Sequence, residues 1–146
     1  MKVVCRKTKA LTEFIEAVRL RTDVFVREQG FKPGWEPDEY DASATQFVAV
    51  LKNKVIATAR FRETAPRVFK IERMAVARKF RRKGVGARLC AAMLNEINCR
   101  KPRKVWLRSQ LACASFYEKL GFHKTSKPKK IYGVTHVEMS LTKRAA

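Results

Sequence analysis

The chain has 146 residues, 46% of them apolar, so its length and composition fit a single compact domain with a sizeable core. Thirty-three Lys and Arg against thirteen Asp and Glu give a formal net charge of +20, which implies an anionic partner such as nucleic acid, an anionic cofactor, an acidic substrate or an acidic membrane surface. There is no uncharged apolar run of about 18 residues and no secretory leader pattern, so we expect a cytoplasmic protein without a membrane partner.

The first forty residues predict a strand, a helix and a loop. Polar and apolar residues alternate over 2–7, which predicts the strand. Apolar residues recur at helical spacing over 11–21 and run on to residue 26, which predicts a helix. Residues 30–41 contain Pro33, Gly34, Pro37 and several acidic residues, and this content of helix and strand breakers predicts a loop.

Three strands with short links follow and predict an antiparallel meander. The strands are expected at 46–51, 55–62 and 68–76, with a hairpin between the first two and a turn at Pro66 before the third. The period then changes to three or four residues, which predicts a long helix over 84–99.

The last third predicts a strand at 104–108, a helix at 112–120 that ends at Gly121, and a strand at 133–141, with room for another strand near Phe122. The order strand, helix, three strands, helix, strand, helix, strand predicts one α/β (α+β) domain over residues 1–146. Its sheet should be mixed, mostly antiparallel, six or seven strands wide and flanked by helices.

Cysteine and histidine spacing predicts no metal site. The four cysteines show no C-x-x-C spacing, and the two histidines do not accompany them at metal-ligand intervals. We therefore expect reduced, packed thiols and neither a zinc site nor a Cys-His nucleophile.

A cationic loop with two glycines lies between the third meander strand and the long helix. Five of the six residues 78–83 are Lys or Arg, and Gly84 and Gly86 follow at the expected start of the helix. Glycines allow a ligand close to the backbone, and the first N–H groups of a helix favour an anion. Cations at this end oppose the helix dipole unless an anion is bound, so the pattern indicates a phosphate site rather than an ordinary turn.

Two motifs give the chain a resemblance to the GNAT superfamily of N-acetyltransferases. Arg81, Gly84 and Gly86 match the superfamily's R-x-x-G-x-G pattern, and residues 112–122 resemble its A-x-x-F-Y-x-x-x-G-F segment. Residues 24–30 and 38–41 look like the early segment of a bacterial-type subgroup, so the resemblance covers nearly the whole chain.

The resemblance implies a sheet whose two central strands splay apart to admit the pantetheine of acetyl-CoA, the cosubstrate, whose pyrophosphate lies on the glycine loop. Arg78, Lys79 or Arg88 could reach the 3′-phosphate. The expected cofactor-binding residues are Met74, Ala75, Val76, Arg81, Arg82, Lys83, Gly84, Val85, Gly86, Ala87 and Tyr117.

Tyr117 and Glu72 are the catalytic candidates. The resemblance places Tyr117 beside the thioester, and a phenol with a pKa near 10 can give a proton to a departing thiolate. Glu72 precedes Met74 by two residues and would share its strand face, so it could act as a base. An ion pair with Arg73 or another cation accounts for Glu72 equally well.

The acceptor side is less well defined by the sequence. Many members carry an asparagine at the end of the strand before the tyrosine helix, where this chain reads Leu107-Arg108-Ser109-Gln110. We expect Glu72, Arg73, Arg108 and Gln110 to bind the acceptor, with Asp41, Glu28 and His136 as weaker candidates.

Three functions remain open at this point. The basic composition favours a small anionic amine such as glucosamine 6-phosphate as acceptor, and a protein lysine or N-terminal amine is the alternative within the same enzyme class. A basic nucleic-acid-binding module is the alternative of another class, but the chain lacks an aromatic single-strand platform or a groove-reading motif, so nucleic acid is not the favoured partner. A homodimer is compatible with all three.

Overall fold

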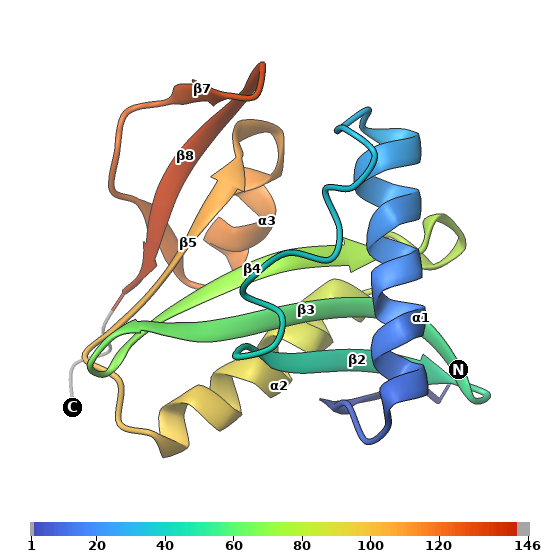
Figure 1. The fold of residues 1–146 in the computed structure, drawn as a ribbon. Coiled ribbons are helices and arrows are strands. Elements are labelled where there is room, and N and C mark those ends of the chain that lie inside the picture. Colours follow the sequence, from blue (N-terminus) through green and yellow to red (C-terminus); the bar gives the residue numbers. More distant parts are fainter. Residues whose placement is uncertain (1, 143–146) are drawn as a thin grey trace.

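An open sheet of eight strands organises the chain in the computed structural model, which describes residues 2–142 (Figure 1). The spatial order is β1-β2-β3-β4-β5-β8-β6, and β7 pairs with β8 off this path. The strands are β1 (Val4–Lys7), β2 (Thr45–Leu51), β3 (Lys54–Ala65), β4 (Val68–Val76), β5 (Lys104–Gln110), β6 (Phe122–Lys124), β7 (Lys129–Ile131) and β8 (Val134–Leu141).

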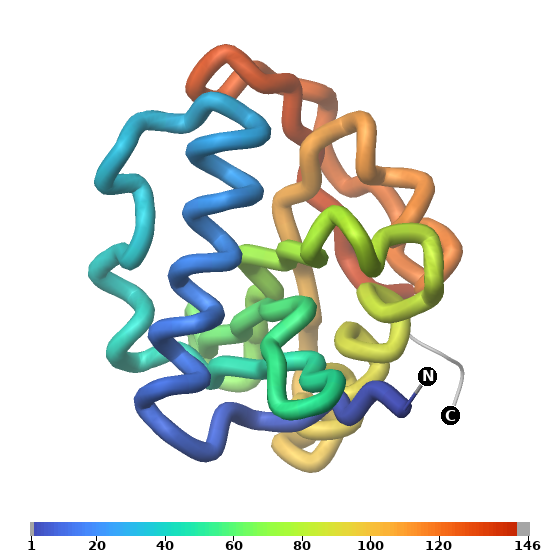
Figure 2. Tube along the Cα trace, turned by 90° about the vertical axis from the view of Figure 1, so that its right-hand side faces the viewer, coloured from blue at the N-terminus to red at the C-terminus, as the bar shows by residue number. Residues whose placement is uncertain are grey.

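Helices connect the strands and cover the sheet. They are α1 (Leu11–Arg21) with its π-helical extension η1 (Thr22–Glu28), α2 (Val85–Cys99), α3 (Ala114–Lys119), and the 3₁₀ turns η2 (Arg78–Phe80) and η3 (Leu111–Cys113). Helices α1 and α2 lie on opposite faces of the part of the sheet formed by β1 to β4 (Figure 2). None of the helices in the described part of the chain is long and apolar enough to cross a membrane.

The mixed, mostly antiparallel sheet expected from the sequence is confirmed, with one more strand than the expected six or seven. The additional strand is β7, which has only three residues, two of them lysines, and pairs with β8 through Lys129↔His136 to Ile131↔Val134. A segment this short and polar has no period-two apolar pattern, so sequence patterning does not detect it.

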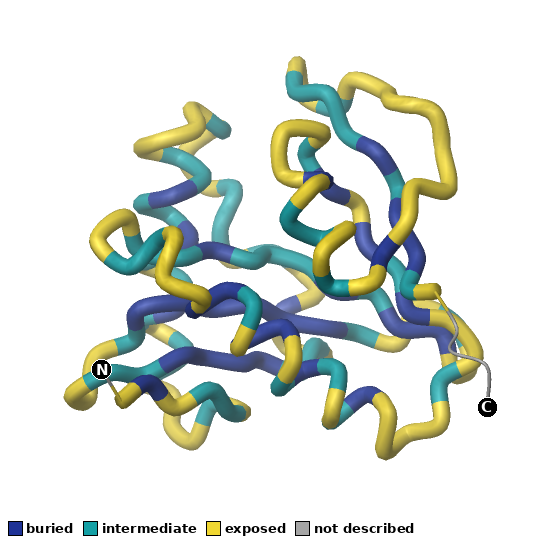
Figure 3. The backbone as a smooth tube through the Cα atoms, turned by 180° about the vertical axis from the view of Figure 1, so that it is seen from behind, coloured by how far each residue is buried: buried dark blue, intermediate teal, exposed yellow. Residues whose placement is uncertain are grey.

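The two faces of the central strands differ in character. Phe61 and Phe69 pack edge to face with ring centroids 6.0 Å apart, and they belong to the buried cluster that includes Leu89 and Met93 of α2. Alternate residues of the same strands, such as Arg60 and Lys70, are charged and face the other way. Buried stretches follow the central strands in Figure 3, whereas the connecting loops are mostly exposed. The apolar face therefore forms the core, and the polar face is left for the site.

The sheet forks between β4 and β5, the only parallel pair on the path. Their register runs from Val68↔Lys104 to Ile71↔Leu107 and then stops, because β4 continues along β3 while β5 continues along β8 (Figure 1). At this point β4 contains one extra residue relative to β3, between the pairs Thr58↔Ala75 and Arg60↔Glu72. Arg73 adopts a left-handed φ of 57° in this bulge. The bulge bends β4 away from β5, and the expected splay is confirmed.

Candidate active site

A cavity of about 430 Å³ lies at the fork. Residues 71–74 of β4 line one side, residues 107–110 of β5 line the other, and Tyr117 of α3 also lines it. All four expected acceptor residues, Glu72, Arg73, Arg108 and Gln110, line it together with Met74. Residues 75–88, which include most of the expected cofactor residues, are absent from its lining.

The cationic loop lies at the first turn of α2, as the sequence predicts. Gly84 is the residue before the helix and has a left-handed φ of 77°, and Arg82 has a φ of 60°. The N–H of Arg88 reaches the carbonyl of Gly84, so the N–H groups of Val85, Gly86 and Ala87 have no partner within the helix. Backbone donors and the helix dipole therefore converge at this end of α2 and favour an anion.

Gly86 has a packing role that the motif does not reveal. A Cβ at this position would lie 3.2 Å from the tip of the Phe116 ring and 3.6 Å from a methyl group of Val76. The 3.2 Å contact would require the ring to shift, so the glycine lets α2 and α3 approach one another closely. A Cβ at Gly84, in contrast, would meet no atom within 4 Å.

The guanidinium of Arg81 is bound within the protein. One of its terminal nitrogens lies 2.8 Å from Glu28 at the end of η1, and its Nε donates to the carbonyl of Val76 at 2.9 Å. The hydrogen bond from Arg81 lowers the pKa of Glu28. The motif arginine thus ties η1 and the end of β4 to the cationic loop, and the backbone of the loop remains the better candidate for phosphate contacts.

Tyr117 lines the cavity, and its hydroxyl is unpartnered. Its ring packs edge to face against Phe116 at 4.9 Å and against Phe122 at 6.0 Å, which fixes its orientation. No hydrogen bond joins this hydroxyl to any other residue of the described chain. Burial raises the pKa of Tyr117, and the nearby thiols of Cys90 and Cys113 add to this effect. The phenol therefore keeps its proton at neutral pH and is available as a donor.

Glu72 is an ion-pair partner, which makes the predicted base role a poor fit. It accepts from Arg62 Nε at 2.7 Å and lies 3.0 Å from Lys70 and 3.1 Å from Arg60. Burial opposes its ionisation, but the hydrogen bond from Arg62 and the charges of Lys70 and Arg60 outweigh it and lower the pKa of Glu72 to about 2. A carboxylate with this pKa is too weak a base to take a proton from an ammonium group.

Arg73, the sequence neighbour expected to pair with Glu72, bonds elsewhere. Because the bulge turns its backbone, its guanidinium lies 2.8 Å from Glu36 and 3.0 Å from Asp38, both in the loop before β2. Gln110, another expected acceptor residue, donates to the side chain of Gln29 at 2.8 Å. Arg108 is 40% exposed, and its partner carboxylate, Glu138, is 4.0 Å away.

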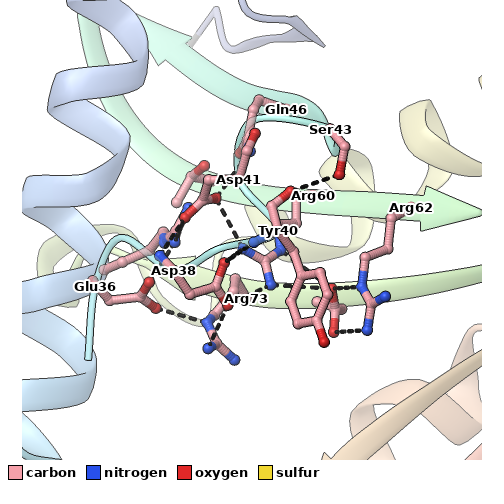
Figure 4. Close-up of polar contacts among 12 residues, drawn as sticks. Glu36, Asp38, Tyr40, Asp41, Ser43, Gln46, Arg60, Arg62 and Arg73 are labelled. Atoms are coloured by element: carbon pink, nitrogen blue, oxygen red, sulfur yellow. Dashed lines mark hydrogen bonds and ion pairs between the residues drawn. The ribbon is translucent and has the colours of Figure 1, made fainter. Parts of the chain in front are cut away.

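A buried ion network attaches the loop 30–41 to the sheet (Figure 4). Asp41 accepts two hydrogen bonds of 2.8 Å from Arg21 and one of 2.9 Å from Arg60. Arg60 also binds Asp38 at 2.6 Å and 2.8 Å, and Arg21 pairs with Glu36. Arg21 and Arg60 are each 1% exposed. Sequence patterning missed this network because its partners come from α1, the loop and β3, and the run of acidic residues before β2 is its only local signal.

Three aromatic side chains that line the cavity contact one another. Phe31 stacks on Trp35 with ring centroids 5.1 Å apart, and Trp35 meets Tyr132 edge to face at 4.9 Å. The first two residues belong to the loop after η1, and Tyr132 lies in the turn between β7 and β8. The Trp35–Tyr132 contact thus joins two parts of the chain that lie on either side of the fork.

The described residues contain no group of three or more His, Cys, Asp or Glu placed to hold a metal ion. The cavity lining carries phenols, guanidinium groups, one ammonium group, one imidazole, and two carboxylates that pair with the cations.

Comparison with known proteins adds the following similarities. The model of the Acetyltransferase (GNAT) domain matches residues 23–143. The Bacillus subtilis (strain 168) protein "Putative acetyltransferase BSU40680" is 31% identical over 127 residues, covering 85% of this chain and 86% of that protein. Escherichia coli ElaA has a similar crystal structure, with a TM-score of 0.86, 21% identity, and coverage of 97% of this chain and 100% of the other. A GNAT family acetyltransferase from Elizabethkingia anophelis with acetyl-CoA bound aligns with a TM-score of 0.70 and 16% identity over 95% of this chain and 97% of the other.

Proposed function

Because the chain belongs to the GNAT acetyltransferase family and is an acyl-CoA-dependent acetyltransferase, we propose that it transfers acetyl from acetyl-CoA directly to a primary amine. In this proposal the acceptor is a small molecule and Tyr117 is the general acid. The observation that carries this proposal is the unpartnered Tyr117 hydroxyl in the cavity at the fork.

Two features support the fit of acetyl-CoA to this chain. The backbone donors at the first turn of α2 suit a pyrophosphate, because they are unpaired within the helix and the space beside Gly84 is open. Beyond Ile71, the edge of β4 that faces the fork has no strand partner. Residues 74–76 can therefore offer backbone groups to the amides of the pantetheine, as the resemblance implies.

The proposed reaction is direct attack within a ternary complex. The neutral amine forms a bond to the acetyl carbon, the bond from that carbon to sulfur breaks, and the thiolate takes the proton of Tyr117. The amine loses one proton to water, because the low pKa of Glu72 makes that residue unsuited to accept it. Tyr117 then recovers its proton from solvent, so protons balance over the cycle.

The aromatic contact across the cavity supports a small acceptor over a lysine on a folded protein. Trp35 and Tyr132 meet at 4.9 Å and narrow the approach from that side. The charged lining, with Arg62, Lys70 and Arg108, supports an anionic acceptor, of which glucosamine 6-phosphate is an example.

A turnover screen tests the proposal. The purified chain is incubated with acetyl-CoA and a panel of phosphorylated amino sugars, amino acids, polyamines, aminoglycosides and lysine peptides. CoA release is followed with a thiol reagent, and the acetylated product is identified by mass spectrometry. We expect at least one small amine to be acetylated at a rate above that of hydrolysis. Exclusive acetylation of peptides would replace the small-molecule proposal with the protein-directed one.

A further inference from the structure

Three cationic side chains form the floor of the cavity on neighbouring strands. Arg62 of β3 is directly opposite Lys70 of β4, and Lys70 is opposite Trp106 of β5. Arg108 follows Trp106 by two residues, so it projects from the same face of the sheet. Arg62, Lys70 and Arg108 all line the cavity, and this cationic floor is defined by these three residues.

The carboxylates near the cationic floor do not balance its charge. Within the described chain, Glu72 is the carboxylate bonded to both Arg62 and Lys70, at 2.7 Å and 3.0 Å, and it is also shared with Arg60. The partner of Arg108 is 4.0 Å away. Two of the three cations therefore depend on a single shared carboxylate, and the third has only a distant one.

This arrangement destabilises the protein when no ligand is bound. Like charges directly opposite on neighbouring strands repel. The Lys70 side chain is only 12% exposed, so water screens the repulsion poorly. Burial lowers the pKa of Lys70. The charges of Arg108 and Arg62 also lower this pKa, whereas Glu72 raises it. Unbalanced buried charge of one sign in a cavity is characteristic of a ligand-binding site rather than of a structural ion pair.

Building on the proposed function, we propose that the cationic floor is an anion subsite that binds the carboxylate or phosphate group of the acceptor and thereby selects the acceptor. Guanidinium groups donate paired hydrogen bonds to either anion, and the ammonium adds a point charge. Glu72 acts as a positioning residue, because it holds Arg62 and Lys70 side by side. Tyr117 lines the same cavity. The carboxylate or phosphate of the acceptor therefore binds the cationic floor while the amine of the acceptor reaches the fork.

Matched acceptors and matched variants test the subsite. The acceptor pairs differ only in the anionic group: glucosamine 6-phosphate against glucosamine for phosphate, and phenylalanine against phenylalanine amide for carboxylate. The variants are Lys70→Met, which keeps an unbranched buried side chain, and Arg108→Gln on the more exposed residue. Lys54→Met, at the exposed first residue of β3 and away from the cavity, is the control.

We expect the anionic member of at least one pair to be preferred. Its kcat/KM should fall on the order of 10-fold or more in Lys70→Met and Arg108→Gln, mainly through KM, because hydrogen bonds to a charged group are lost. The loss for the neutral member should be smaller than for its anionic partner, and Lys54→Met should match the wild type with both members. Equal use of both members of each pair, or an equal loss for both in Lys70→Met, would overturn the proposal.

A binding measurement separates this proposal from the proposed function. Thermal unfolding is recorded with saturating CoA, which occupies the phosphate site at the glycine loop, and with inorganic phosphate against sodium chloride of equal ionic strength. We expect phosphate to raise the Tm of the wild type and of Lys54→Met, and to raise that of Lys70→Met less. An equal rise in all three proteins rejects the subsite even if no acceptor is found. Failure of CoA itself to raise the Tm would reject the proposed function. In that case the difference in Tm shift between wild type and Lys70→Met in phosphate would still show whether the subsite exists.

Discussion

Tyr117 and Glu72 line the same cavity, but their surroundings suit them to different roles. Aromatic neighbours hold the ring of Tyr117 and leave its hydroxyl without a partner, which is appropriate for a proton donor. Glu72 is surrounded by three cations that keep it ionised and hydrogen-bonded. The two roles differ because of the side chains that the fold brings near each residue. The neighbouring residues in the sequence do not reveal this difference.

The first prediction concerns the hydroxyl of Tyr117. Tyr117→Phe keeps the ring packing and removes the donor, so kcat should fall on the order of 100-fold while folding and CoA affinity stay near those of the wild type. Steady-state kinetics and isothermal titration with CoA measure the two effects separately. A variant that retains full kcat while the chemical step limits turnover would show that the thiolate leaves without this proton.

At the level of elements, the first turn of α2 combines two glycines with separate tasks. Gly84 supplies a left-handed backbone at a place open to a ligand, whereas Gly86 allows the close approach of Phe116. One sequence motif therefore combines the proposed anion site with a packing contact between α2 and α3. Substitutions at the two positions are expected to act on different properties.

The second prediction uses a matched pair of glycines. Gly84→Asp places a carboxylate beside the unpaired N–H groups of α2, and CoA affinity should fall at least ~10-fold because the carboxylate competes with and repels the pyrophosphate. Gly30→Asp is the control, because Gly30 has nearly the same φ, 78° against 77°, and equally open space. Both variants should lose on the order of 1–2 kcal/mol of stability from the left-handed backbone. Equal CoA affinity in the two variants, measured by titration, would place the pyrophosphate elsewhere.

The third prediction concerns the contact between the loop after η1 and the turn between β7 and β8. Tyr132→Ala removes the edge-to-face partner of Trp35, and an aromatic pair of this kind contributes about 0.5–1.5 kcal/mol. The amide of Trp35, which bonds the carbonyl of Lys32, should then exchange its hydrogen faster. The amides of α2 provide the internal control and should not change. Unaltered exchange at Trp35 would mean that the ion network alone holds the loop.

Local sequence patterns predict the regular elements well and their junctions poorly. The period of the apolar residues places α2 correctly to within a residue, because one face of this helix packs on the core. The position of the fork follows from a single extra residue at Arg73, whose left-handed backbone has no local signature such as glycine. The resemblance implied the splay, but the residues that surround it, Glu36 and Asp38 above all, come from a loop more than thirty positions away.

For the molecule as a whole, a few of the acidic residues hold the buried arginines of the core. The chain has thirteen Asp and Glu, and four of them, Glu36, Asp38, Asp41 and Glu72, hold buried or half-buried arginines against the site. Breaking such a buried pair is costly, since it leaves an uncompensated charge. The high net charge therefore coexists with a core network in which nearly every cation is paired.

The fourth prediction is that acid unfolds the protein through this network. The pKa of Glu72 is about 2 in the folded protein against an ordinary value of 4.5, so its ionised form stabilises the fold above pH 4.5, and this contribution is lost as the pH falls toward 2. Thermal unfolding should show a Tm that declines over this range.

Glu72→Gln provides the comparison. It should be less stable than the wild type at pH 7, and the difference should shrink between pH 4.5 and 2, because the wild-type side chain becomes neutral there. A difference in Tm that stays constant over the whole range would show that Glu72 contributes through shape rather than charge.

The fork also affects how the protein behaves in a test tube. A strand edge without a partner can template the addition of another strand, and β4 beyond Ile71 has such an edge inside the molecule. A ligand that pairs with this edge would shield it, so we expect the backbone proposed to receive pantetheine to promote self-association in ligand-free preparations. Keeping CoA in the buffer should therefore extend the shelf life of concentrated samples, and short extended peptides that mimic a strand offer a route to inhibitors of this enzyme.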